Sequence, residues 1–226
     1  MEFLIALSKI MMVNIVLSGD NAVVIAMASR CLPPKQQKMA ILWGSAGAIG
    51  LRILLTIVAV VLLQIPYLQF LGGLLLIWIA AKLLIEENHD ENINASSSMW
   101  AAVKTIIIAD IVMSLDNTLA IAAIANGDYL VLGIGLALSI PLIIFGSQIL
   151  VAIMNRFPII VFIGAALIAW TAGEMVNADP QIGAHIVQYI PHWIVPTALT
   201  VAVVGYGYYT QKKRGKATHG EPESDS

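Results

Sequence analysis

Long apolar stretches dominate the chain, and short polar segments separate them. A membrane-spanning helix needs about 20 mainly apolar residues, and seven stretches approach or exceed that length. They lie near residues 3–28, 39–63, 67–85, 100–125, 129–152, 158–177 and 193–210. Most of the connections contain proline or glycine, which end regular elements. The pattern predicts an all-α membrane protein with seven transmembrane helices in one domain, residues 1–210.

The basic residues predict the orientation of these helices. Connections that face the cytoplasm are enriched in Lys and Arg. If the N-terminus is outside, every predicted inner connection or its flanking helix end carries Lys or Arg, and the predicted outer connections carry none. The sequence therefore predicts an N-outside, C-inside topology. Residues 211–226, with four basic residues, are predicted to be a disordered cytoplasmic tail.

Composition excludes several classes of function. Of the 226 residues, 59% are hydrophobic and 12% are charged, whereas about a quarter are charged in a soluble domain. The net charge of −2 gives no argument for a nucleic-acid partner, and the single Cys31 cannot form an internal disulfide. No G-x-x-x-x-G-K-[ST] motif is present, so transport driven by ATP within this chain is not expected. No enzymatic activity is expected either.

The two halves of the chain share a pattern, because three segments recur in the same order. They are residues 18–21 and 114–117, residues 50–54 and 146–150, and residues 70–78 and 162–170. With three helices per copy, the second copy is inverted in the membrane relative to the first, as in many secondary transporters. We therefore predict a 3+3 inverted-topology repeat plus one C-terminal helix. Repeat one is 1–85, repeat two is 100–177 and the extra helix is 193–210.

Acidic and amide side chains recur inside the apolar stretches. A charge costs about 3 kcal/mol or more at the centre of a bilayer, so an acid there indicates a functional site. On regular helices, the spacing places Asn14, Ser18 and Asn21 on one face, and Asp110, Ser114 and Asn117 on the corresponding face of the other half. The candidate metal-ligating residues are Asp20, Asp110, Asp116, Asn21, Asn117 and Asn14.

These ligand types favour a hard divalent cation. Carboxylate and amide oxygens suit Mn²⁺, Mg²⁺ and Ca²⁺. No histidine lies in the first six predicted helices, which disfavours a site selective for Zn²⁺. The choice among the three oxygen-bound ions stays open on the residues alone.

Two further charged residues are candidates for a gate or an outer vestibule. Arg52 lies near the middle of the second predicted helix and needs a partner there. We expect a structural or gating ion pair with one of the acids. Glu174 lies near the outer end of the sixth helix. It is either a helix-end acid facing water or a ligand in an outer vestibule.

The motifs resemble those of the TerC family of bacterial integral membrane proteins, within the lysine-exporter-like group. The resemblance covers residues 1–210 and rests on three motifs. They are Ser18-Gly19-Asp20-Asn21-Ala22, Asp110-x5-Asp116-Asn117, and the Phe-x-Gly…Trp pattern of the third and sixth helices. It implies seven helices, export of Mn²⁺ from the cytosol, and acidic metal residues at Asp20, Asp110 and Asp116. It also implies a multi-pass protein of the bacterial cytoplasmic (inner) membrane.

The leading hypothesis is a secondary exporter of Mn²⁺, with proton antiport through the same acids as the economical coupling. Mn²⁺ is then a transported substrate, and no permanently bound cofactor is expected. The expected partners are the lipid bilayer and the divalent ion, and homo-oligomerisation is left open. One alternative is an exporter of an organic cation or amino acid. The other is a membrane scaffold or secretion accessory that transports nothing.

Overall fold

The structure is a computed structural model of the chain, and it describes residues 19–62, 65–85, 95–125 and 129–218. All the regular elements in these ranges are helices, which confirms the predicted all-α class. The helices are α2 (Gly19–Ser29), α3 (Pro34–Leu62), α4 (Leu68–Ile85), α5 (Ala95–Ala125), α6 (Tyr129–Arg156), α7 (Ile159–Ala178), α8 (Gly183–Tyr189) and α9 (Ile194–Thr218).

From residue 34 onward, each predicted apolar segment coincides with one helix. Within the described residues, 4 helices are long and apolar enough to cross a membrane. These candidate spans are Pro34–Thr56, Leu68–Ile85, Ser98–Leu115 and Ile159–Ala178, and Ile140–Arg156 is a shorter apolar stretch. Most of the first predicted segment, residues 3–28, lies outside the described residues.

Some helix boundaries differ from the prediction. Helix α3 begins at Pro34, α5 begins at Ala95, and α9 continues to Thr218 into the tail that was predicted to be disordered. Proline is favoured in the first turn of a helix, and Lys, Gln and Ala are good helix formers, so a helix need not end where the apolar stretch ends. The short helix α8 was not predicted. Residues 219–226 lie outside the described residues.

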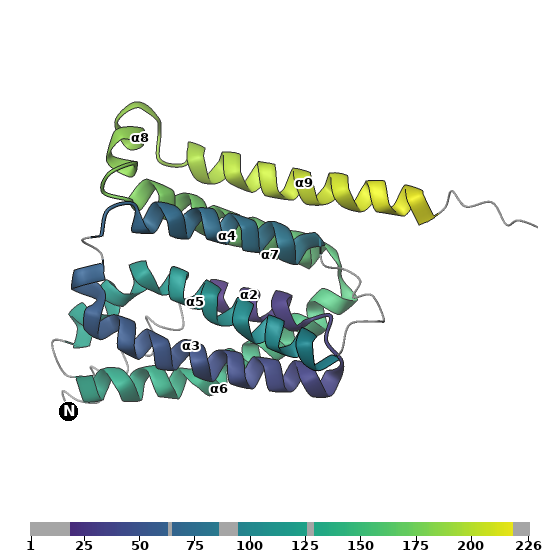
Figure 1. Cartoon of the computed structure of the whole chain (residues 1–226), viewed down its shortest axis with the longest axis horizontal. Helices are drawn as coiled ribbons and strands as arrows, with labels where there is room; N and C mark the ends of the chain where they lie inside the picture. The colour runs from purple at the N-terminus through teal and green to yellow at the C-terminus, as the bar shows by residue number, and fades with distance from the viewer. Residues whose placement is uncertain (1–18, 63–64, 86–94, 126–128, 219–226) are drawn as a thin grey trace, which may run out of the picture.

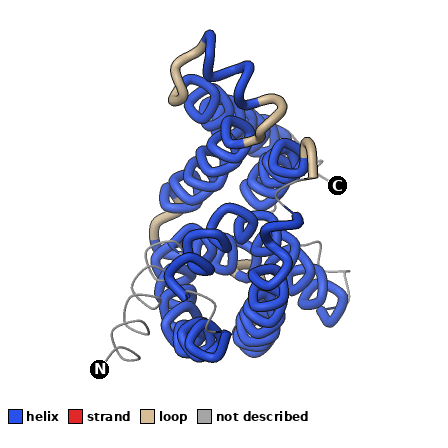
Figure 2. The backbone as a smooth tube through the Cα atoms, turned by 90° about the vertical axis from the view of Figure 1, so that its left-hand side faces the viewer, coloured by secondary structure: helices blue, strands red, loops and turns tan. Residues whose placement is uncertain are grey.

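The long helices form two groups. Helices α2, α3, α5 and α6 make one group, and α4, α7 and α9 make the other (Figure 1). Helix α3 packs along α5, and α4 packs along α7, whose other side contacts α9. Figure 2 shows the long helices nearly end-on. The largest buried apolar cluster joins the two groups, with Val24, Leu76, Ala109, Val151 and Ile168 among its members.

Glycines allow the closest approaches between helices, as small residues commonly do in membrane proteins. A Cβ atom on Gly47 of α3 would lie 2.8 Å from Cδ1 of Ile107 on α5. A Cβ atom on Gly73 of α4 would lie 2.7 Å from the backbone oxygen of Ala172 on α7. The end of the Ile107 side chain can shift, but the backbone of Ala172 cannot, so the α4–α7 pair depends on glycine at position 73.

We expect Gly73→Ala to lower the free energy of unfolding by about 1–3 kcal/mol, because the added methyl group overpacks the α4–α7 contact. Gly205→Ala in α9 is the matched control, since a Cβ atom there meets nothing within 4 Å. Alanine in an open helical position stabilises by about 0.5–1 kcal/mol over glycine. Thermal unfolding of the purified variants in detergent measures both effects. Equal melting temperatures for the two variants would contradict this packing.

Candidate functional site

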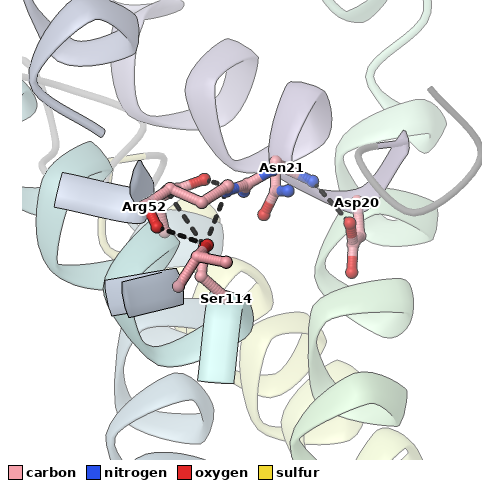
Figure 3. A network of polar contacts seen from close by, with 6 residues as sticks. Asp20, Asn21, Arg52 and Ser114 are labelled. Atoms are coloured by element: carbon pink, nitrogen blue, oxygen red, sulfur yellow. Dashed lines mark hydrogen bonds and ion pairs between the residues drawn. The ribbon is translucent and has the colours of Figure 1, made fainter. Parts of the chain in front are cut away.

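Polar side chains from three helices meet within the apolar bundle (Figure 3). Helix α2 contributes Asp20 and Asn21 in its first described turn, α3 contributes Arg52, and α5 contributes Asp110 and Ser114. We call these five residues the polar cluster. All of these residues except Ser114 were predicted from the sequence as candidate site or gate residues. Ser114 was predicted to share a helix face with Asp110.

Arg52 and Asp110 form a buried ion pair that joins α3 to α5. Arg52 is 1% exposed. Its Nη2 donates to Oδ1 of Asp110, and its Nε donates to the Ser114 hydroxyl over 2.8 Å. The Ser114 hydroxyl in turn donates to Oδ2 of Asp110 over 3.2 Å, across one turn of α5. The expected pairing of Arg52 with one of the acids is confirmed, and Asp110 is its partner.

Asn21 of α2 lies next to Arg52 in Figure 3, and Asp20 lies on the side of Asn21 that is away from Arg52. Asp20 is partly buried, its Oδ1 accepts the backbone N–H of Asn21 over 2.8 Å, and it lies within electrostatic range of both Arg52 and Asp110. The Asn21 side chain is 3% exposed. Neither its Nδ2 nor its Oδ1 has a hydrogen-bond partner in the part of the chain that the structure describes.

A buried amide without partners is costly. Leaving a buried polar group unsatisfied costs about 1–3 kcal/mol, and native proteins pair most such groups. The side chain of Asn21 therefore has unused hydrogen-bonding and ligating capacity next to a carboxylate. Its Oδ1 and the Asp20 carboxylate are oxygen donors of the type that hard cations prefer.

Three of the predicted ligands cannot be placed in the cluster. Asn14 lies outside the described residues. Asp116 and Asn117 belong to α5, beyond Leu115, but their side chains are outside the described part. Among the side chains that are described, no group of three or more His, Cys, Asp or Glu is arranged to hold a metal ion. A site formed by Asp20, Asp110 and Asp116 together therefore stays a prediction.

Glu174 lies apart from the polar cluster, on the exposed face of α7. Its Oε1 accepts a hydrogen bond of 3.0 Å from the indole Nε1 of Trp170, one turn earlier in the same helix. The choice between a water-facing acid and a vestibule ligand stays a prediction.

Sequence analysis missed one buried acid, Asp179. It is 1% exposed and follows the last residue of α7. Its Oδ2 accepts the backbone N–H of Phe70 at the start of α4, over 3.2 Å. Its Oδ1 accepts the N–H groups of Gln181 and Ile182, over 3.0 and 3.1 Å. The only signal in the sequence is an Asp-Pro step at the end of an apolar stretch, which is typical of any turn.

Comparison with known proteins gives the family context. The model of the integral membrane protein TerC family matches residues 1–215. The chain is 42% identical over 205 residues to Uncharacterized membrane protein YjbE of Bacillus subtilis (strain 168), covering 91% of this chain and 93% of that protein. It is 27% identical over 173 residues to UPF0053 inner membrane protein YgdQ of Escherichia coli (strain K12), covering 68% and 72%.

A longer relative matches along only part of its length. The chain is 26% identical over 221 residues to UPF0053 protein YegH of Escherichia coli (strain K12). The match covers 88% of this chain and 40% of YegH. No solved structure matches.

Two buried polar residues test this geometry, because the Asn21 side chain has no partner among the described residues and the Asp179 side chain accepts three hydrogen bonds. We expect Asn21→Ala not to lower the melting temperature, because its side chain has no hydrogen bond to lose among the described residues and the cost of burying the unpaired amide is removed. We expect Asp179→Ala to lower the free energy of unfolding by about 3 kcal/mol or more, because three backbone N–H groups lose their acceptor. Thermal unfolding of both variants decides the point. A clear loss of stability in Asn21→Ala would contradict the unpaired amide.

Proposed function

The chain belongs to the integral membrane protein TerC family, and from this membership and the polar cluster we propose that it is a secondary transporter of divalent cations. It is a multi-pass membrane protein, and the proposed direction is export from the cytosol. A relative is named an inner membrane protein, which supports the bacterial cytoplasmic membrane as its location.

One observation carries the proposal, namely the buried amide of Asn21, which has no hydrogen-bond partner among the described residues and adjoins the carboxylate of Asp20. A scaffold that only crosses the membrane has no need of an acid in its interior, and such residues mark ion pathways in membrane proteins. The same Asp-Asn dipeptide recurs as Asp116-Asn117. We therefore propose that the two dipeptides supply ligands from the two halves of the transporter.

The proposed architecture is a 3+3 inverted repeat with one additional helix. Under this repeat, the packing of α3 on α5 corresponds to that of α6 on α2, and both pairs are in contact. Gly72 of α4 and Gly164 of α7 are repeat counterparts. A Cβ atom on Gly72 would press on Val112 of α5, and one on Gly164 would press on Val23 of α2. These matched contacts support the repeat.

Mn²⁺ is the proposed substrate. The oxygen ligands are compatible with Mn²⁺, Mg²⁺ and Ca²⁺, and the preference for Mn²⁺ comes from the family resemblance. Moving a divalent cation out of a negative interior costs about 4.6 kcal/mol at 100 mV, from about 2.3 kcal/mol per charge. Export therefore needs a steep gradient or coupling, and we propose exchange against protons.

Flux into proteoliposomes tests the proposal. Purified protein is reconstituted, and Mn²⁺, Mg²⁺ and Ca²⁺ are compared while internal pH is recorded. We expect the Mn²⁺ flux to fall at least about tenfold in Asp20→Asn, Asn21→Ala and Asp116→Asn. Each variant lacks one ligand, and a ligand worth about 1.4 kcal/mol changes binding tenfold. Asn21→Ala is the most informative variant, since its fold should be unaffected.

Glu174→Gln is the matched control, because it also neutralises an acid in an apolar helix but at an exposed position. We expect its flux to stay within about twofold of the wild type, since exposed charges interact weakly. Normal Mn²⁺ flux in Asp20→Asn would contradict the proposed site. Wild-type protein that moves an amino acid or organic cation but no metal, or moves nothing, would contradict the proposed substrate.

A further inference from the structure

A groove between α4 and α5 combines positive charge with an apolar wall, and none of its lining residues belongs to the polar cluster. Its volume is about 250 Å³. The residues that line it include Leu75, Trp78 and Lys82 of α4, and Ala101, Lys104 and Ile108 of α5. In each helix these three residues are spaced i, i+3 and i+7, so they share one face. The groove is therefore built from two facing helix surfaces.

The lysines and the apolar residues occupy different depths along the groove. Lys82 is in the last turn of α4, and residues 86–94 lead from there to α5. Leu75 lies two turns earlier in α4, about 10 Å along the helix at about 1.5 Å per residue. Ile108 likewise lies further along α5 than Lys104. Under the predicted topology the connection is cytoplasmic, so the lysines lie nearer the inner headgroups and the apolar residues nearer the acyl chains.

The position of the Lys82 ammonium is unusual for a lysine near a membrane surface. Such a side chain ordinarily extends its charge toward the headgroups and water. The Nζ atom of Lys82 instead lies over the indole ring of Trp78, 5.4 Å from the centroid, and Trp78 is one turn nearer the middle of α4. On the other wall, Lys104 is exposed. The groove thus presents two positive charges beside an apolar surface.

The sequence itself offers one rival source of negative charge. Residues 86–91 directly follow α4 in the sequence and contain four acids, and they lie outside the described residues. Carboxylates of a polar connection have no use for an apolar wall, however, and Leu75 and Ile108 supply one. A ligand that uses the whole groove needs both an anionic group and a hydrocarbon chain.

The internal repeat shows that the positive groove has no copy in the other half. Trp78 recurs as Trp170, but Lys82 corresponds to Glu174 and Lys104 corresponds to Ser8. Under the proposed inverted repeat, the positive groove is on the cytoplasmic side and its counterpart on the other side carries an acid. Basic pockets between membrane helices on the cytoplasmic side are typical sites for anionic lipid headgroups.

We propose that the groove between α4 and α5 binds an anionic phospholipid, with its phosphate between Lys82 and Lys104 and an acyl chain along Leu75 and Ile108. Helices α4 and α5 belong to different helix groups (Figure 1). The lipid therefore bridges the two groups at their cytoplasmic end. This inference goes beyond the proposed function and does not depend on which ion is transported.

Lipid retention by the purified full chain tests the proposal. The protein is mixed in detergent with equal amounts of phosphatidylglycerol and the zwitterionic phosphatidylcholine, and the bound lipids are counted by native mass spectrometry. We expect the wild type to retain phosphatidylglycerol at least about tenfold over phosphatidylcholine, a ratio equivalent to about 1.4 kcal/mol. The double variant Lys82→Gln/Lys104→Gln should lose this preference. Lys35→Gln/Lys38→Gln in α3 is the matched control, because it removes the same charge at exposed positions outside the groove. It should keep the preference.

A second variant tests the shape of the groove without changing its charge. Ala101 is exposed and lines the groove, so Ala101→Phe fills part of the space and leaves both lysines in place. We expect its retention of phosphatidylglycerol to fall at least about tenfold. Its melting temperature in detergent without added lipid should match that of the wild type, since the new ring replaces no packed side chain.

Three results would overturn the lipid site. The first is a wild type without a preference between the lipids, as expected if the acidic connection alone neutralises the lysines. The second is an equal loss in both lysine double variants with full retention in Ala101→Phe, which indicates general attraction to an anionic surface. The third is complete displacement of phosphatidylglycerol from the wild type by inorganic phosphate, which indicates a site for a free anion.

Discussion

The interaction on which the site depends is the buried ion pair between Arg52 and Asp110. It connects α3 to α5 at a depth where an unpaired charge would be strongly unfavourable. Toward the start of α3, the same two helices are held together by the close contact of Gly47 with Ile107. The α3–α5 seam therefore combines a tightly packed part with a polar part.

The position of Asn21 follows from this constraint. Helix α2 packs against both α5 and α6, and this packing buries the Asn21 amide beside the ion pair without giving it a partner in the described residues. Apolar packing thus keeps the Asn21 amide in the interior, where it is available to bind a cation. The fold is stabilised elsewhere, through the joined core of the two helix groups and through the Asp179 cap between α7 and α4.

The sequence predicted the helices well because apolar length is a local property. The repeated Asp-Asn dipeptides were also recognisable as candidate site residues, because acids are rare in apolar stretches. It predicted that Arg52 needs an acidic partner but not which one, because Arg52 and Asp110 are separated by 58 positions and meet only through helix packing. The cap formed by Asp179 went unpredicted for the same reason, since its partner Phe70 is 109 positions away.

The central claim is that the polar cluster binds a divalent cation. The most direct measurement is a crystal structure of the protein grown with Mn²⁺, with anomalous scattering recorded at the manganese edge. The account predicts an anomalous peak at ligand distance from the oxygens of Asp20 and Asn21. A cluster without a peak at saturating Mn²⁺ would contradict it.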